Sequence, residues 1–167
     1  MDEELETLRV PWMISPSMPL LRLCVGEDEI EDSVSFRAYF RGRSNLVSTP
    51  RVDPAGPFPQ HVKEPDYGMV RFTFPKGVWA RYKYGRDSDQ DFGRSFDPSC
   101  SRESLDQQWL TSGCCPHPRA YLVRRSAWMR ELGVGEERYV HLVFDGHEGY
   151  VEVVARGWAW AELRSDP

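Results

Sequence analysis

The feature that most constrains the fold is a period-two alternation of apolar and polar residues, which recurs in several short segments. In residues 34–40 (VSFRAYF) four apolar side chains fall on one face, as they do in a half-buried β-strand. Residues 69–74 alternate in the same way, and residues 20–25 form a short apolar segment suited to a partner strand. Segments of this kind are typical of an antiparallel sheet with one face on a core.

A turn sequence follows the second of these segments. Pro75-Lys76-Gly77 separates residues 69–74 from residues 78–84, which again have the composition of a strand. Because proline and glycine favour chain reversal between two such segments, we expect a β-hairpin here.

A second hairpin is expected near the C-terminus. Residues 145–149 (DGHEG) hold two glycines, which supply unusual φ angles, and they separate residues 139–144 from residues 150–155. Gly157 then marks a bulge or a bend, after which residues 158–161 continue the alternation.

Helix is scarce. Ser126 is a suitable N-cap for residues 127–132, and Gly133 is a suitable C-terminal stop. Residues 102–110 have the composition of a second short helix. The sequence therefore predicts an α+β fold, mainly antiparallel β-sheet built from hairpins, with one or two short helices.

The chain of 167 residues is about the length of one domain. Residues 41–68, with five prolines, and residues 85–101, which are polar, lack apolar periodicity. We expect a single domain over residues 1–167 with these two segments as long loops, which are usually functional or disordered.

The sequence also indicates a cellular location. No apolar segment reaches the roughly 20 residues that span a bilayer, and the first six residues (MDEELE) are acidic, unlike a secretory signal. The four cysteines include an adjacent pair, which is unsuited to a disulfide framework. We expect a cytoplasmic protein without membrane contact. Arginine outnumbers lysine 18 to 3, which favours a GC-rich, bacterial source.

Charge is unevenly distributed along the chain. Residues 1–32 hold nine acids and two arginines, whereas the remainder holds 17 acids and 19 bases. This balance disfavours nucleic acid binding, and it suits one basic protein partner, although surface charge also serves solubility. The acidic residues that we expect to contact such a partner are Glu27, Asp28, Glu29, Glu31, Asp32, Asp87, Asp89 and Asp91.

Two groups of residues have metal-binding side chains without the matching spacing. Residues 87–91 (DSDQD) resemble the start of a calcium loop, but Phe92 stands at the position of the turn glycine and Pro98 at that of the bidentate glutamate. The second group consists of the two adjacent cysteines, a nearby histidine and a more distant cysteine. The spacing of these residues differs from that of the paired ligands of standard zinc sites. The members are Cys100, Cys114, Cys115 and His117. We expect no metal or other cofactor.

Catalysis is a further possibility at the C-terminal hairpin. His141 and His147 lie near the carboxylates of Asp145, Glu148 and Glu152, and a histidine beside a carboxylate can act as a general base. His141 and Glu152 are expected to face each other across two strands, on the face opposite the apolar one and therefore toward solvent. Since no diagnostic catalytic motif accompanies them, we expect a protein that is not an enzyme.

The last third of the chain holds residues 112–118 (SGCCPHP), Trp128 and residues 141–155 (HLVFDGHEGYVEVVA). In these residues the chain resembles small bacterial immunity proteins encoded beside polymorphic toxins. The resemblance implies a cytoplasmic inhibitor that binds one toxin domain, and it transfers no catalytic residues. We therefore expect a specific protein-binding protein of this type. The alternatives are a small hydrolase that uses His141 or His147 with a carboxylate, and a structural component of a larger bacterial assembly.

Overall fold

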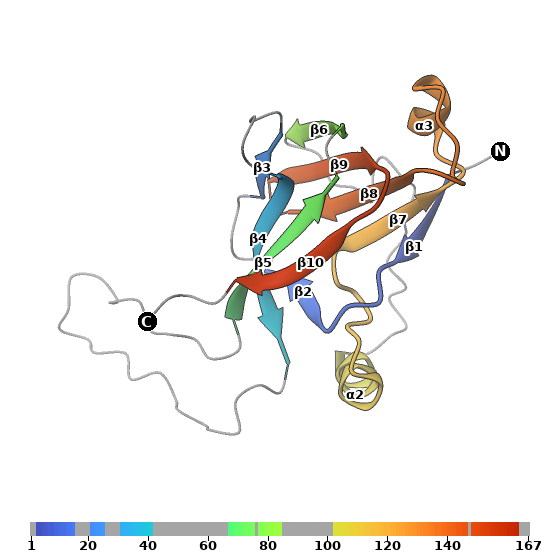
Figure 1. Ribbon diagram of the computed structural model, residues 1–167. Coiled ribbons are helices and arrows are strands. Elements are labelled where there is room, and N and C mark those ends of the chain that lie inside the picture. The colour runs from blue at the N-terminus through green and yellow to red at the C-terminus, as the bar shows by residue number, and fades with distance from the viewer. Residues whose placement is uncertain are drawn as a thin grey trace.

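The computed structural model confirms the predicted fold class: the residues that it describes form mainly antiparallel β-sheet with two short helices (Figure 1). It describes residues 3–15, 21–25, 31–41, 67–75, 77–84, 102–146 and 148–163. Most of the two long loops expected at 41–68 and 85–101 lies outside these ranges. Within them, no helix has both the length and the apolar character needed to cross a membrane.

The first sheet has five antiparallel strands in the order β1-β7-β8-β9-β6. These are β1 (Glu4–Thr7), β7 (Ala120–Arg124), β8 (Val140–Asp145), β9 (Gly149–Ala155) and β6 (Trp79–Tyr84). The hairpin predicted near the C-terminus is confirmed as β8 and β9, with Leu142 opposite Val153. The hairpin lies between β7 and β6 in the strand order, and β9 is buried along its whole length.

The second sheet has the order β10-β5-β4-β2. A further strand, β3, also pairs with β4. Its strands are β10 (Ala159–Leu163), β5 (Tyr67–Phe74), β4 (Asp32–Phe40), β2 (Trp12–Ile14) and β3 (Arg22–Cys24). The predicted partnership between residues 20–25 and residues 34–40 is confirmed, because Leu23 lies opposite Val34.

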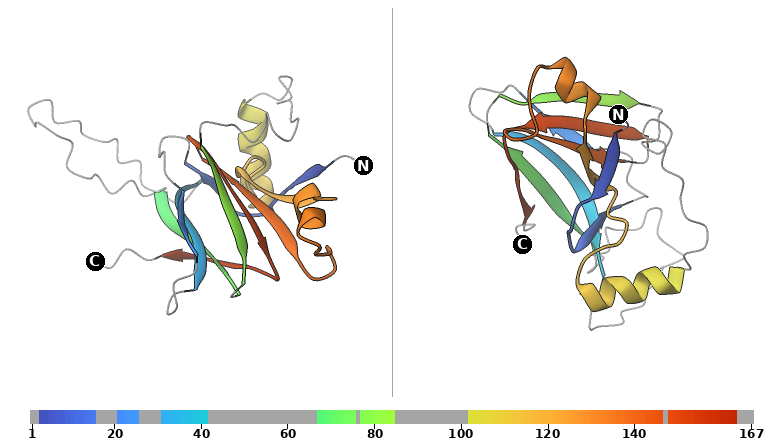
Figure 2. Two further views of the ribbon diagram at one scale, coloured as in Figure 1. Left: turned by 90° about the horizontal axis from the view of Figure 1, so that it is seen from above. Right: turned by 90° about the vertical axis from the view of Figure 1, so that its right-hand side faces the viewer.

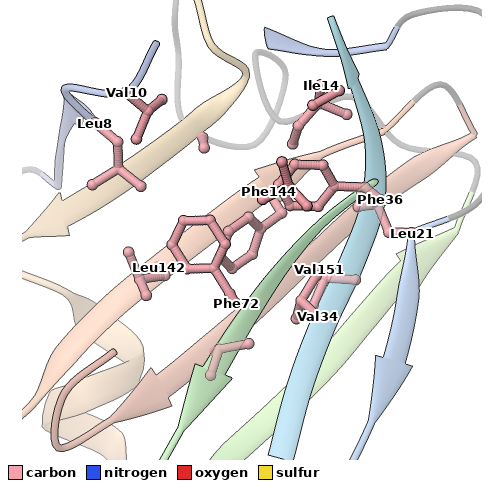
Figure 3. Packing of buried hydrophobic residues seen from close by; sticks show 14 of the residues in the cluster. Leu8, Val10, Ile14, Leu21, Val34, Phe36, Phe72, Leu142, Phe144 and Val151 are labelled. Atoms are coloured by element: carbon pink, nitrogen blue, oxygen red, sulfur yellow. The ribbon is translucent and has the colours of Figure 1, made fainter. Parts of the chain in front are cut away.

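An aromatic core fills the space between the two sheets (Figure 3). The rings of Phe72 and Phe144 come from different sheets and have centroids 4.8 Å apart. Trp12 packs on Phe36 with its ring centroid at 5.1 Å. Burial of each such ring contributes roughly 1.5–3 kcal/mol. In the right-hand view of Figure 2, β6 and β9 cross steeply over β4 and β5.

The hairpin predicted around Pro75-Lys76-Gly77 is wrong. β5 pairs with β4 and β10, whereas β6 pairs with β9 in the other sheet. Gly77, directly before β6, has a φ of 89°. A proline and a glycine between two strands are compatible either with a hairpin or with a crossing from one sheet to the other. Pairing with β9 puts alternate side chains of β6, Ala80 and Tyr82, against the core.

A second crossing follows β9. Gly157 lies at the predicted bend, but residues 158–161 do not continue the same strand. They enter β10, which pairs with β5 so that Trp160 lies opposite Phe72. Trp158 and Trp160 both pack against the core from this side, and their apolar surface accounts for the change of sheet.

Gly149 allows the hairpin to close against β6. Its φ is 155°, and a Cβ at this position would overlap the main-chain oxygen of Lys83. The neighbouring turn closes through a hydrogen bond of 2.9 Å from the Gly146 amide to the Gly149 carbonyl. Glycine is therefore required here for close approach between two strands.

Both predicted helices are present. α2 spans Arg102–Ser112 and α3 spans Ala127–Glu131. The hydroxyl of Ser126 caps α3 by accepting a hydrogen bond of 3.0 Å from the Met129 amide. Gly133 has a φ of 70°, as a helix stop requires.

Candidate functional site

The candidate site lies on the outer face of the first sheet, the face turned away from the aromatic core. Four polar residues meet there: Arg81 on β6, His141 on β8, Glu152 on β9, and Ser126 at the start of α3. We call this group the polar cluster. The strand periodicity positions it, since His141, Glu152 and Arg81 alternate with core residues along three neighbouring strands.

Glu152 is the centre of the polar cluster. Its carboxylate accepts two hydrogen bonds from the guanidinium of Arg81, 2.6 Å from Nε and 2.9 Å from Nη2. The ammonium of Lys83 lies 3.5 Å from the same carboxylate. The Glu152 side chain is 1% exposed, whereas that of Arg81 is 37% exposed. A buried acid is therefore neutralised by cations that reach it from the surface.

His141 joins Glu152 to α3. Its Nε2 lies 3.2 Å from Glu152 Oε1, and its Nδ1 lies 2.8 Å from Ser126 Oγ. Ser126 Oγ already accepts from the Met129 amide, so its own proton is free to be donated to Nδ1. In that arrangement Nδ1 is the acceptor and Nε2 carries a proton, toward the carboxylate.

Three effects set the pKa of Glu152. Burial alone would raise it. The hydrogen bonds from His141 and Arg81, and the charges of these groups, outweigh burial and lower the pKa from 4.5 to about 2. Glu152 is therefore ionised throughout the physiological pH range.

Trp128, the second residue of α3, covers the polar cluster. Its ring meets His141 edge-on with centroids 5.3 Å apart, and the guanidinium carbon of Arg81 lies 4.0 Å from the centre of its ring. His141 and Glu152 face each other as expected, but the expectation that they point to solvent is wrong, because they are 1% and 0% exposed. The cause is α3, which packs over a face that strand periodicity alone marks as polar.

The polar cluster contains the three groups that catalysis by a serine nucleophile uses, but all three are buried. A serine, a histidine and a carboxylate follow one another at hydrogen-bonding distances, as in hydrolases that use a serine nucleophile. Ser126, however, is 2% exposed and caps a helix. In this arrangement the three groups join α3 to the sheet.

β6 forms one margin of the first sheet (Figures 1 and 2). Among the described strands it pairs only with β9, so its other side presents main-chain hydrogen-bonding groups. Trp79 at its start and Tyr84 at its end are 36% and 70% exposed. Arg81, between them, is fixed by Glu152. The result is a strand edge that no other described strand pairs with and that has an exposed aromatic ring at each end, which we call the β6 edge.

The opposite margin of this sheet differs in its charge. On β1, Glu4 pairs with Arg125 at 2.9 Å and Glu6 pairs with Arg124 at 2.7 Å. The Glu3 carboxylate accepts a hydrogen bond of 2.6 Å from the first amide of α3, at Ala127. The acidity at the start of the sequence is thus paired within the fold. The adjacent arginines Arg124 and Arg125 are the sequence feature that could have indicated these ion pairs.

Most of the predicted partner-binding residues lie outside the described ranges, namely Glu27, Asp28, Glu29, Asp87, Asp89 and Asp91. Of the two that are described, Glu31 is exposed directly before β4. Asp32 is the first residue of β4, is 7% exposed and lies opposite Phe74.

The second histidine of the proposed catalytic group, His147, also lies outside the described ranges. Asp145 is buried and binds Arg119, with 2.9 Å between Oδ2 and Nη2. Tyr84 donates a hydrogen bond of 3.1 Å to Glu148. The structure therefore brings together only His141 and Glu152 from that group. Sequence reasoning missed Arg81 and Lys83, although both alternate with the inward side chains of β6.

The cysteines form no metal cluster in the described part of the chain, where no three metal-ligating side chains converge. Cys115 is 4% exposed, and burial raises the pKa of its thiol to about 12. Cys114 and His117 are half-buried, and Cys100 lies outside the described ranges.

Comparison with protein-family models, with curated proteins and with solved structures found no match to this chain.

Proposed function

We propose that this chain is a specific protein-binding protein, a cytoplasmic immunity protein that neutralises one domain of a bacterial toxin. The observation that supports binding is the β6 edge, with Trp79 and Tyr84 exposed at its two ends. An extended segment of a partner can add to such an edge through main-chain hydrogen bonds. Exposed aromatic rings supply the apolar contacts that dominate many protein interfaces.

The polar cluster supports this role by fixing the edge in place. Two hydrogen bonds tie Arg81, in the middle of β6, to the buried carboxylate of Glu152. The same side chain stacks on Trp128, which belongs to α3. A strand held in this way loses little conformational entropy when a partner binds, which favours affinity.

The toxin-directed part of the proposal rests on the resemblance of residues 112–118 and 141–155 to immunity proteins. The second segment is the β8–β9 hairpin, to which β6 is paired. The proposed basic character of the partner rests on the acidic residues around 27–32 and 87–91, of which Glu31 is exposed in the structure.

The test is an affinity capture from lysate of the source organism, quantified by mass spectrometry, with three forms of the tagged full chain. The wild type is compared with the double variant W79A/Y84A and with Met69→Ala as the matched control. Met69 is 42% exposed but lies on β5, in the other sheet. We expect one protein to be captured in near-equal amount by wild type and control, and at least tenfold less by the double variant. Equal capture by all three forms would refute the β6 edge as the binding site.

A small hydrolase is the alternative, and the chain of hydrogen-bonding groups through Ser126, His141 and Glu152 favours it. It requires Ser126 to become accessible. Labelling with a fluorophosphonate probe separates the two functions, because a reactive serine is modified covalently at its hydroxyl. Modification of Ser126 that is lost in His141→Ala would support the hydrolase. The binding function predicts that Ser126 stays unmodified in the folded protein.

A further inference from the structure

A surface pocket lies at the open end of the β8–β9 hairpin, where β8 begins and β9 ends. Arg138 and Tyr139, directly before β8, line it together with Arg156, directly after β9. Its volume is about 370 Å³, which is within the range of small-ligand pockets. Two of its three lining residues are permanently cationic.

The hydrogen bonding within the pocket leaves donors available. Arg156 Nε donates a hydrogen bond of 3.1 Å to the hydroxyl oxygen of Tyr139, and its guanidinium carbon lies 5.6 Å from the centre of the Tyr139 ring. Because this oxygen acts as the acceptor, the hydroxyl proton of Tyr139 can be donated to a ligand. The two terminal nitrogens of Arg156 keep their own protons.

The charge of the two arginines is not neutralised by a described carboxylate. Within the described ranges no Asp or Glu forms an ion pair with Arg138 or Arg156. Other arginines do form such pairs, among them Arg41, Arg81, Arg119, Arg124 and Arg125. The nearest acid in sequence, Glu137, has its carboxylate beside Gly135. A pocket with two uncompensated guanidinium groups attracts an anion.

An aromatic wall borders the pocket. The ring of Trp79 lies 5.6 Å from that of Tyr139, centroid to centroid, and Trp79 is 36% exposed. A ligand that presents its anionic group to the arginines could therefore place an apolar or planar part against Trp79.

We propose that the pocket formed by Arg138, Tyr139 and Arg156 is an oxyanion-binding site, which takes a carboxylate or phosphate group. The two guanidinium groups bind the anion's oxygens and the Tyr139 hydroxyl donates a third hydrogen bond. Two sources share this chemistry: a small phosphate-bearing molecule, and the acidic side chain of a protein. The site is independent of the proposed toxin-neutralising function, because the contacts to the anion come from the three residues of the pocket.

The experiment follows the arginine Nε–Hε resonances of the full chain by NMR during titration with inorganic phosphate and, separately, with N-acetyl-aspartate. The variants are Arg156→Gln, Arg138→Gln and Tyr139→Phe. Arg71→Gln is the matched control, because Arg71 is an exposed arginine on β5 in the other sheet.

In the wild type we expect saturable shifts of the Arg138 and Arg156 resonances and no such shift of the Arg71 resonance. The Arg71→Gln variant should bind the anion with the same affinity as the wild type. Each arginine variant should weaken binding about tenfold, the effect of one charge-assisted hydrogen bond. Tighter binding of phosphate assigns the site to a phosphate-bearing small molecule, and tighter binding of N-acetyl-aspartate assigns it to an acidic side chain. Shifts that do not saturate, or that are equal at Arg71, would overturn the proposal.

Discussion

Replacement of Glu152 by glutamine tests the energetics of the polar cluster. The side chain keeps its shape but loses its charge, so the bonds from Arg81 and His141 become weaker. The pKa of Glu152 is lowered from 4.5 to about 2 in the folded protein, and each unit corresponds to about 1.4 kcal/mol. The ionised carboxylate thus contributes about 3 kcal/mol to the free energy of unfolding at pH 7.

The same shift fixes the pH dependence. The folded protein holds this proton less tightly than the unfolded chain, so the stabilisation is fully present above pH 4.5. It is lost as the pH falls toward 2. Wild type and Glu152→Gln should differ by about 3 kcal/mol at pH 7, and the difference should shrink as the pH falls to 2, because Glu152 becomes protonated around and below that pH.

Urea unfolding of both proteins, followed by tryptophan fluorescence between pH 7 and pH 2, measures this difference. Glu6→Gln is the matched control, because Glu6 pairs with Arg124 while 54% exposed. An exposed pair of this kind should contribute less than about 1 kcal/mol. A difference between wild type and Glu152→Gln that is below 1 kcal/mol at pH 7, or that stays constant with pH, would refute this reasoning.

Three further predictions concern single positions. Ser126→Ala removes the cap of α3 and a buried hydrogen bond to His141, and it should lower the free energy of unfolding by about 1–3 kcal/mol in urea titrations; a loss below 0.5 kcal/mol would contradict the assigned role. Gly149→Ala places a methyl group against the Lys83 carbonyl and should cost more than about 2 kcal/mol in the same assay, whereas a neutral effect would show that β6 does not approach so closely. The Cys115 thiol, with its pKa raised to about 12 by burial, should resist iodoacetamide at pH 8 in the folded protein and react in urea; equal rates in both states would contradict its burial.

Local patterns predicted the elements well. Alternation identified β4, and Ser126 with Gly133 marked the two ends of α3. The two glycines in residues 145–149 marked the hairpin that forms the centre of the first sheet. In each case the determining interactions lie within a few residues of one another, so the sequence records them directly.

Pairing between distant strands was less accessible. The sequence Pro75-Lys76-Gly77 is compatible either with a hairpin or with a crossing between sheets, and the strand that pairs with β6 decides which one forms. That strand is β9, about 70 residues further along the chain. The change of sheet at Gly157 depends likewise on contacts with Phe72.

The candidate site was predicted in part. The sequence placed His141 and Glu152 on one face of two neighbouring strands, and their side chains meet there at 3.2 Å, although the register sets His141 opposite Val154 and Glu152 opposite Val143. Their burial depends on α3, whose docking position no local pattern specifies. The same limitation hid the role of Arg81, whose partners Glu152 and Trp128 are distant in sequence.

Hydrogen–deuterium exchange of the full chain, with and without its captured partner, shows whether the β6 edge is the binding surface. We expect amides of residues 79–84 to become protected in the complex, while those of β5, in the other sheet, keep their exchange rates. Protection confined to other segments, with residues 79–84 unchanged, would contradict this proposal.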